Sequence, residues 1–162
     1  MRGLLTVVGI VLAAAVGPAA ASEWGAIVPG TSTMESVRAQ YGGPTKTTTQ
    51  KVDNYDTATW VYEGAQAPRG LVRMTVDFGI LQAAGYRGDV VRALKLEPKP
   101  GVFSKGVILT GWGRPDRAGK QGGVDVFFYA EGLIVTFDKD GRQAQSMTFT
   151  PPQPLEPATP SR

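Results

Sequence analysis

The chain contains no cysteine and no histidine among its 162 residues. Without cysteine it has no disulfide and no cysteine-linked lipid, so any membrane association must come through a partner. Without histidine, Ser-His-Asp catalysis, Cys-His catalysis and ordinary zinc sites are excluded. Only carboxylate, lysine or tyrosine chemistry remains for an enzyme. We therefore expect a protein that is not an enzyme and that holds no metal and no other cofactor.

The chain also carries little net charge. The formal net charge is only +3, and the basic residues are scattered along the chain. A nucleic-acid-binding surface would gather them into a cluster interleaved with aromatic residues. The sequence therefore predicts no nucleic-acid partner.

The first residues have the pattern of a secretory signal peptide. Arg2 supplies the positive charge, Leu4–Val16 the apolar stretch and Ala19–Ala21 the small-residue cleavage site. The stretch is shorter than the ~20 residues of a spanning helix, although an uncleaved N-terminal anchor is the alternative. We expect a signal peptide at residues 1–21 and a periplasmic or secreted protein that lacks a direct membrane anchor after cleavage.

An imperfect internal repeat organises the rest of the chain. The segment from Pro29 to Pro44 aligns without a gap with the segment from Pro100 to Pro115. An aromatic run follows each segment, at Trp60–Tyr62 and at Phe127–Tyr129. The repeat predicts an α+β fold of two tandem helix-plus-antiparallel-sheet units, at residues 22–97 and 98–150, with the helices on one face of the sheet.

In the first unit, Ser32 and Glu35 have the spacing of a capping box. The helix that follows should end at Gly42–Pro44, because proline cannot continue it. Thr45–Thr57 is polar and reads as a connection. Alternating apolar residues then predict three strands, at residues 58–62, 72–78 and 89–96.

In the second unit, residues 102–112 fit a helix or a strand. Gly106 and Gly111 each disfavour a helix by about 1 kcal/mol, whereas alignment with the first unit favours one. Three strands are expected at residues 124–129, 133–137 and 144–149, the last two joined by a turn at Asp138–Gly141. Residues 151–162 form a proline-rich tail, read either as a solvated extended segment or as a docking segment for an aromatic groove.

Few residues are candidates for a site. Asp138–Gly141 lacks the ligand spacing of a calcium loop and is interpreted as a turn. Asp53, Asp56 and Glu63 are acids that could serve a glycosidase, but solvated loop acids are the preferred interpretation. Alternation assigns Trp60, Phe78, Phe128 and Phe137 to the core. The predicted partner-binding residues are Asp53, Tyr55, Asp56, Phe127 and Tyr129.

Short motifs carry a resemblance to known families. Gly30, Ser32, Ser36-Val37, Tyr41-Gly42, Pro44 and Trp60–Tyr62 resemble the BamE-type (SmpA/OmlA-like) lipoprotein subunit of the outer-membrane β-barrel assembly machine. The tandem arrangement is similar to the β-lactamase inhibitor protein. This chain lacks the lipidated cysteine of the first and the disulfides of the second. The resemblance implies the fold and a role in binding another protein, and no contact residue.

Together these features predict a non-catalytic protein-binding module of the bacterial cell envelope. Its partner would be an envelope or extracellular protein, docked through aromatic residues of the sheet face and through loops. One alternative is a secreted enzyme inhibitor that inserts the Asp53–Asp56 loop into a cleft. The other is a glycan-binding or carboxylate-dependent hydrolytic domain.

Overall fold

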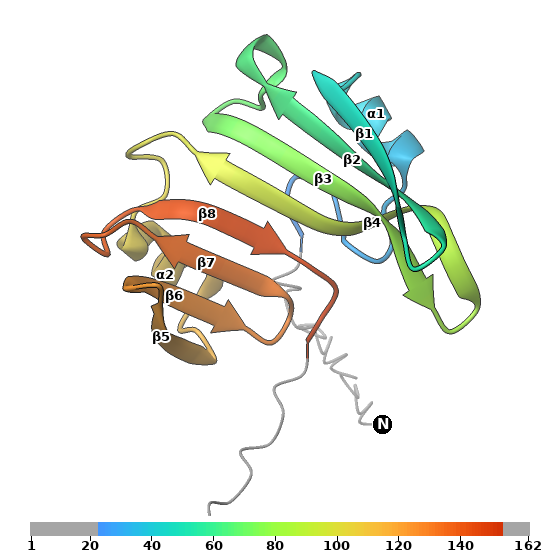
Figure 1. The fold of residues 1–162 in the computed structure, drawn as a ribbon. Coiled ribbons are helices and arrows are strands. Elements are labelled where there is room, and N and C mark those ends of the chain that lie inside the picture. The colour runs from blue at the N-terminus through green and yellow to red at the C-terminus, as the bar shows by residue number, and fades with distance from the viewer. Residues whose placement is uncertain (1–22, 154–162) are drawn as a thin grey trace, which may run out of the picture.

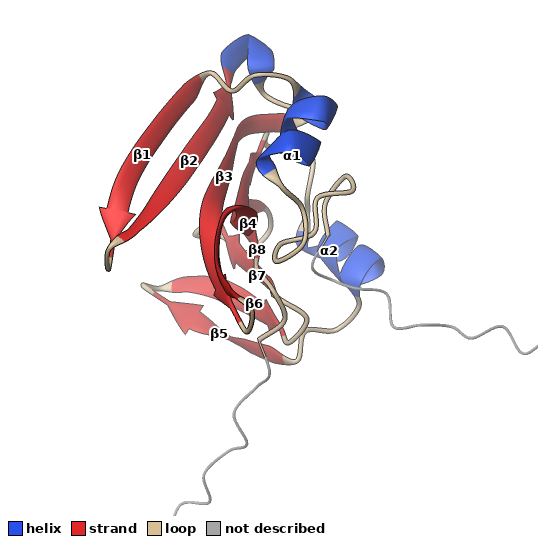
Figure 2. Ribbon diagram, turned by 90° about the vertical axis from the view of Figure 1, so that its right-hand side faces the viewer, coloured by secondary structure: helices blue, strands red, loops and turns tan. Residues whose placement is uncertain are grey.

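One antiparallel sheet of eight strands dominates the computed structural model, which describes residues 23–153 (Figure 1). The strand order is β1-β2-β3-β4-β8-β7-β6-β5. Two eight-residue helices, α1 (Met34–Tyr41) and α2 (Lys105–Trp112), lie on the same face of the sheet (Figure 2). The strands are β1 (Lys46–Val52), β2 (Tyr55–Glu63), β3 (Leu71–Gln82), β4 (Gly85–Pro98), β5 (Arg117–Gln121), β6 (Val124–Tyr129), β7 (Leu133–Phe137) and β8 (Ala144–Phe149).

The predicted fold class is wrong. The chain does not form two tandem helix-plus-sheet units, because β4 pairs directly with β8 and joins all strands into one sheet. Among residues 23–153, strand is far more abundant than helix, which is confined to the two short helices and a single 3-10 turn at Gly64–Gln66. The expectation of three strands in each unit is also wrong, since each half of the sheet has four.

The two missing strands are the edges of the sheet. Every residue of β1 and β5 is exposed, so neither strand shows the apolar alternation by which a half-buried strand is recognised. β1 lies within the segment that was interpreted as a polar connection. The turn to β2 is formed by Asp53 and Asn54, both with positive φ (47° and 68°), as in the two-residue hairpin turns that match strand twist.

The hydrophobic core lies between the sheet and the helices. Directly paired residues point to the same face, and one such row crosses seven strands with every member from β2 onward buried or packed on the core. It consists of Thr47, Trp60, Val76, Leu94, Phe149, Leu133 and Tyr129. Val37 of α1 and Ile108 of α2 are fully buried against this face. Trp60, Phe78 and Phe137 are core residues, as predicted.

Both helices begin at a hydroxyl cap and end at a glycine. The cap of α1 is Thr33, whose hydroxyl accepts from the Ser36 amide while the Ser36 hydroxyl accepts from the Thr33 amide, so the predicted Ser32–Glu35 box is displaced by one residue. Ser104 caps α2 in the same way, through the Val107 amide. Residues 105–112 are therefore helical, because the cap and the burial of Ile108 offset the cost of two glycines.

A tyrosine of the sheet forms a hydrogen bond with the C-terminal end of each helix. The Tyr62 hydroxyl donates to the Gly42 carbonyl, and the Tyr129 hydroxyl donates to the Gly113 carbonyl, both at 3.1 Å. The two glycines have nearly the same backbone angles, φ 75° and ψ −160° against φ 76° and ψ −162°. Burial raises the pKa of both hydroxyls, which therefore remain neutral donors at physiological pH.

An ionic cluster joins the start of α2 to β6. Lys120 and Lys105 donate to Asp125 at 2.8 and 2.9 Å, and these hydrogen bonds lower the pKa of the Asp125 carboxyl to about 2. The Lys105 ammonium also lies 4.9 Å from the ring centre of Phe137. The cluster thus stabilises the helix position through charge and cation–π contacts.

The predicted signal peptide lies outside the described residues, as does the tail beyond Gln153. Within residues 23–153, neither helix is long and apolar enough to cross a membrane.

Candidate functional site

The face of the sheet opposite the helices is concave. In Figure 2 the middle strands lie nearest the helices, and the edge strands β1 and β5 curve away from them. No helix of the described part covers this face, which we call the open face. One row of paired residues crosses it from edge to edge: Lys46, Val61, Thr75, Lys95, Thr148, Ile134, Phe128 and Arg117.

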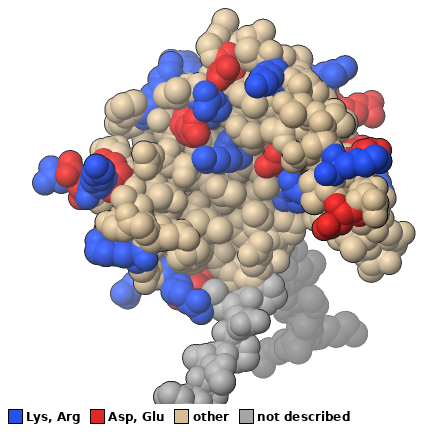
Figure 3. All heavy atoms as spheres, viewed as in Figure 1, with Lys and Arg blue, Asp and Glu red and all other residues tan. Residues whose placement is uncertain are grey.

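Exposure separates the two faces. Every member of the open-face row is half-buried or exposed, whereas the parallel row on the helix side is buried from Trp60 inward. Threonine and aliphatic side chains fill much of the open face, and Figure 3 shows a broad area without charges over its lower half. The open face is therefore a solvent-accessible concave surface of mixed side chains, in contrast to the buried core on the helix side.

The open face carries charges of both signs, and several of them are paired with one another. Arg73 pairs with Glu63 at 2.9 Å and with Glu97 at 3.5 Å, and Lys95 also pairs with Glu97. Asp77 accepts a hydrogen bond from Thr59 at 2.6 Å. Basic side chains outnumber acidic ones by one on this face, with Lys46, Arg73, Arg92, Lys95 and Arg117 against Asp53, Glu63, Asp77 and Glu97.

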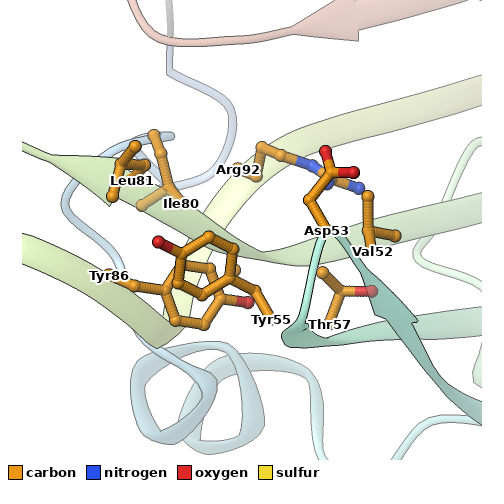
Figure 4. A pocket seen from close by; sticks show the side chains of 9 residues that line it. Val52, Asp53, Tyr55, Thr57, Ile80, Leu81, Tyr86 and Arg92 are labelled. Carbon is orange, nitrogen blue, oxygen red and sulfur yellow. The ribbon is translucent and has the colours of Figure 1, made fainter.

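A pocket opens at one end of this face, beside the β1–β2 turn (Figure 4). Its volume is about 260 Å³. We call it the tip pocket; its lining consists of Val52, Asp53, Tyr55, Thr57, Gly79, Ile80, Leu81, Tyr86 and Arg92. Three large apolar side chains at its edge are well exposed, Val52 and Tyr55 at 41% and Leu81 at 66%.

Two stacked tyrosines form the wall of the tip pocket. The rings of Tyr55 and Tyr86 lie 4.3 Å apart at an angle of 27°. The position of the Tyr86 ring is fixed by its hydroxyl, which donates a hydrogen bond to the Asp56 carbonyl. The ring fits there because Gly79 has no side chain: a β-carbon at Gly79 would lie 2.2 Å from the Tyr86 hydroxyl oxygen. The aromatic wall is therefore prearranged by the fold.

Arg92 supplies the only basic group in the lining. It is the extra residue of β4 at a bulge, because Asp77 pairs with Ala93 and Phe78 pairs with Val91. A bulge of this kind redirects the side chain of a strand residue. The side chain is half-buried. Within residues 23–153 its guanidinium has no hydrogen bond and no ion pair.

The structure gathers three of the five predicted partner-binding residues and separates the other two. Asp53, Tyr55 and Asp56 lie together at the β1–β2 turn, with Asp56 paired to Lys51 at 2.9 Å. Phe127 and Tyr129 were expected on the surface, and that expectation is wrong. Both point to the helix side, Tyr129 at 6% exposure and Phe127 packed edge-on against Phe137.

Sequence reasoning exchanged the faces of β6. Phe128, which was assigned to the core, belongs to the open-face row through its pairing with Ile134. Two consecutive aromatic residues give no indication of which one faces the core, because only pairing fixes the face of a strand residue. Tyr86 and Arg92 were missed as site residues, since nothing in the sequence places the β3–β4 hairpin beside Tyr55.

The three acids considered for hydrolysis have different surroundings. Asp56 and Glu63 are each paired with a cation, Lys51 and Arg73, and Asp53 lines the tip pocket. Within the described range, no group of three histidine, cysteine, aspartate or glutamate residues is placed to hold a metal ion. The open face and its tip pocket are thus the features with the clearest capacity for binding.

Comparison with known proteins gives a likeness of fold. No protein-family model matches the chain, and no curated protein matches it. A solved structure of a DUF4309 family protein (YjgB) from Bacillus subtilis subsp. subtilis str. 168 is similar, with a TM-score of 0.50 and 13% sequence identity. The alignment covers 78% of this chain and 83% of that one. At this identity the likeness concerns the fold alone.

Proposed function

We propose that this protein is a non-catalytic binding module of the bacterial envelope that docks another protein on its open face. The observation that supports the proposal most is the edge-to-edge row of half-buried and exposed side chains on a concave sheet face that no helix of the described residues covers. Such a face offers a large contact area on a rigid scaffold, and rigid contact surfaces reduce the entropy lost on binding.

The placement in the envelope rests on the signal-like pattern of residues 1–21. Export to the periplasm or the exterior would bring the open face into contact with other exported proteins. The BamE-type resemblance suggests the same kind of role, without implying membership of the assembly machine.

The second candidate is inhibition of a secreted enzyme. It is favoured by the β1–β2 turn, where Tyr55 is 41% exposed beside Asp53. An exposed aromatic residue next to an acid can enter the cleft of a hydrolase. The first candidate places the contact across the open face and the second places it at the β1–β2 turn. They also differ in whether the partner loses activity when bound.

Site-specific photocrosslinking tests the proposal. A benzoylphenylalanine replaces Lys95, in the middle of the open face, or Val107, which is 46% exposed on α2. Each variant is expressed in the organism from which the protein comes, and the cells are irradiated. We expect a discrete protein adduct from the Lys95 position that is absent from the Val107 position. No adduct at Lys95, or the same adducts at both positions, would refute docking on the open face.

A further inference from the structure

The geometry points to a defined chemistry for the partner: the tip pocket accepts one large apolar side chain, and Arg92 binds a carboxylate of the same partner segment. The inference rests on the proposed function in taking the occupant to be a protein. It adds that the partner is anchored in the tip pocket, and that the anchoring residues are one large apolar residue and one acid.

The size of the tip pocket fits a side chain. Its volume of about 260 Å³ is below the roughly 300–1,000 Å³ of sites for small molecules. The tyrosine wall, Ile80 and Leu81 make the lining largely apolar. Filling such a hollow with an aromatic or aliphatic group removes Val52, Tyr55 and Leu81 from water, which is the main source of affinity at interface anchors.

The charge requirement follows from Arg92. A half-buried guanidinium has lost part of its hydration, and this cost is normally offset by an acidic partner. Another arginine of the open face, Arg73, has two such partners, Glu63 and Glu97. Arg92 has none within the described chain, so a carboxylate that arrives with the ligand would complete the pattern.

The neighbouring Asp53 makes the pocket selective. Figure 4 draws its carboxylate across the pocket from the tyrosine wall and overlapping the Arg92 guanidinium in this view, although the two groups form no ion pair. One ligand carboxylate would be attracted by Arg92, whereas further acids would be repelled by Asp53. The expected motif is therefore a single aspartate or glutamate next to a large apolar residue, rather than an acidic run.

Defined peptides test this inference. The probe is the blocked peptide acetyl-Gly-Ser-Phe-Asp-Ser-Gly-amide, with one version that has Asn for Asp and another that has Ala for Phe. Binding to the ¹⁵N-labelled protein, expressed as the full chain, is followed by NMR at the amides of Thr57 and Gly79 and at the Arg92 side chain. We expect the Phe-Asp peptide to shift these three signals, the Asn version to bind about fivefold more weakly, and the Ala version about tenfold more weakly.

The variants Arg92→Gln and Arg142→Gln separate a direct contact from a general charge effect. Arg142 is an exposed arginine near the β7–β8 turn, at a distance in the fold from the pocket lining. In Arg92→Gln the Asp and Asn peptides should bind equally, while Arg142→Gln should keep the fivefold difference. The inference would be overturned if Arg92→Gln still bound the Asp peptide more tightly than the Asn peptide. It would also be overturned if the peptides shifted only signals in the middle of the open face, or shifted no signals.

Failure here and failure of the proposed function are distinguishable. If crosslinking at Lys95 succeeds and the peptides do not bind the tip pocket, docking on the open face stands and the anchor assignment is wrong. If the peptides bind as expected and Lys95 gives no adduct, the pocket recognises its motif and the proposed docking on the open face is wrong. Cellotetraose serves as a carbohydrate control, and shifts of the pocket signals by this sugar in place of the peptides would overturn the protein-segment assignment.

Discussion

The substitution Gly79→Ala tests how the tip pocket is built. Gly79 has φ +100°, a conformation that costs a residue with a β-carbon about 1–2 kcal/mol. The new methyl group would lie 2.2 Å from the Tyr86 hydroxyl oxygen and 3.1 Å from the ring carbon that bears it. The tyrosine must therefore move.

The cost of that movement can be worked from the contacts of Tyr86. Its hydrogen bond to the Asp56 carbonyl contributes about 1 kcal/mol, and its stacking on Tyr55 contributes about 1 kcal/mol. With the backbone cost, Gly79→Ala should lower the free energy of unfolding by about 3–4 kcal/mol. Urea denaturation followed by tryptophan fluorescence measures the loss.

Two control variants separate the backbone cost from the cost of moving Tyr86. Gly85 has φ +116° with no atom near its missing β-carbon, so Gly85→Ala should show the backbone cost alone, about 1–2 kcal/mol. In a Tyr86→Ala background, Gly79→Ala should lose the cost of moving the tyrosine and keep the backbone cost together with the 3.3 Å contact to the Thr57 methyl group. The reasoning is refuted if Gly79→Ala is no worse than Gly85→Ala, or if its cost is the same with and without Tyr86.

Two other predictions concern the helix ends and the ionic cluster. Tyr62→Phe and Tyr129→Phe each remove one hydrogen bond to a helix-terminal carbonyl, so each should cost about 1 kcal/mol in urea denaturation, with additive costs in the double variant; a strongly non-additive result would contradict two independent fastenings. Because hydrogen bonds from Lys120 and Lys105 lower the pKa of Asp125 to about 2, the stabilisation should be fully present above the unfolded pKa near 3.8 and disappear as the pH falls through about 2. Asp125→Asn should reduce the loss of stability between pH 4 and 2, and a carboxyl titration by ¹³C NMR near 4 would contradict the cluster.

The local elements were largely predictable because their causes are local. Gly42–Pro44 was expected to end α1, and α1 ends at Tyr41 with Gly42 at a φ of 75°. Alternation indicated β3, although Val72 is exposed because the pairing with β4 shifts register between Leu71 and Arg73. Asp138–Gly141 forms a turn in which the Asp138 carboxylate accepts from two backbone amides.

The site was less predictable because its members come from different hairpins. Tyr55 was recognised as a surface aromatic residue, but the Gly85–Gly88 segment was interpreted only as a turn. Pairing of β3 with β4 brings Tyr86 opposite Leu81, and the β2–β3 pairing then brings both beside Tyr55. A binding role for Arg92 depends on the bulge in β4 that directs its side chain into the pocket lining. No pattern in the sequence predicts that bulge.

By itself, the sequence determined what depends on residue chemistry and short spacing: the exclusion of histidine and cysteine chemistry, the end of α1 at Gly42, the central strands and the aromatic core at Trp60 and Phe137. Only the tertiary structure decided that all strands join in one sheet through β4 and β8, that Phe128 rather than Phe127 faces outward, and that Arg92, without an ion-pair partner among residues 23–153, lies in one pocket with two stacked tyrosines. The physical reason is that strand pairing, register and face are set by contacts between segments distant in the chain, whereas caps, turns and alternation are set by neighbours.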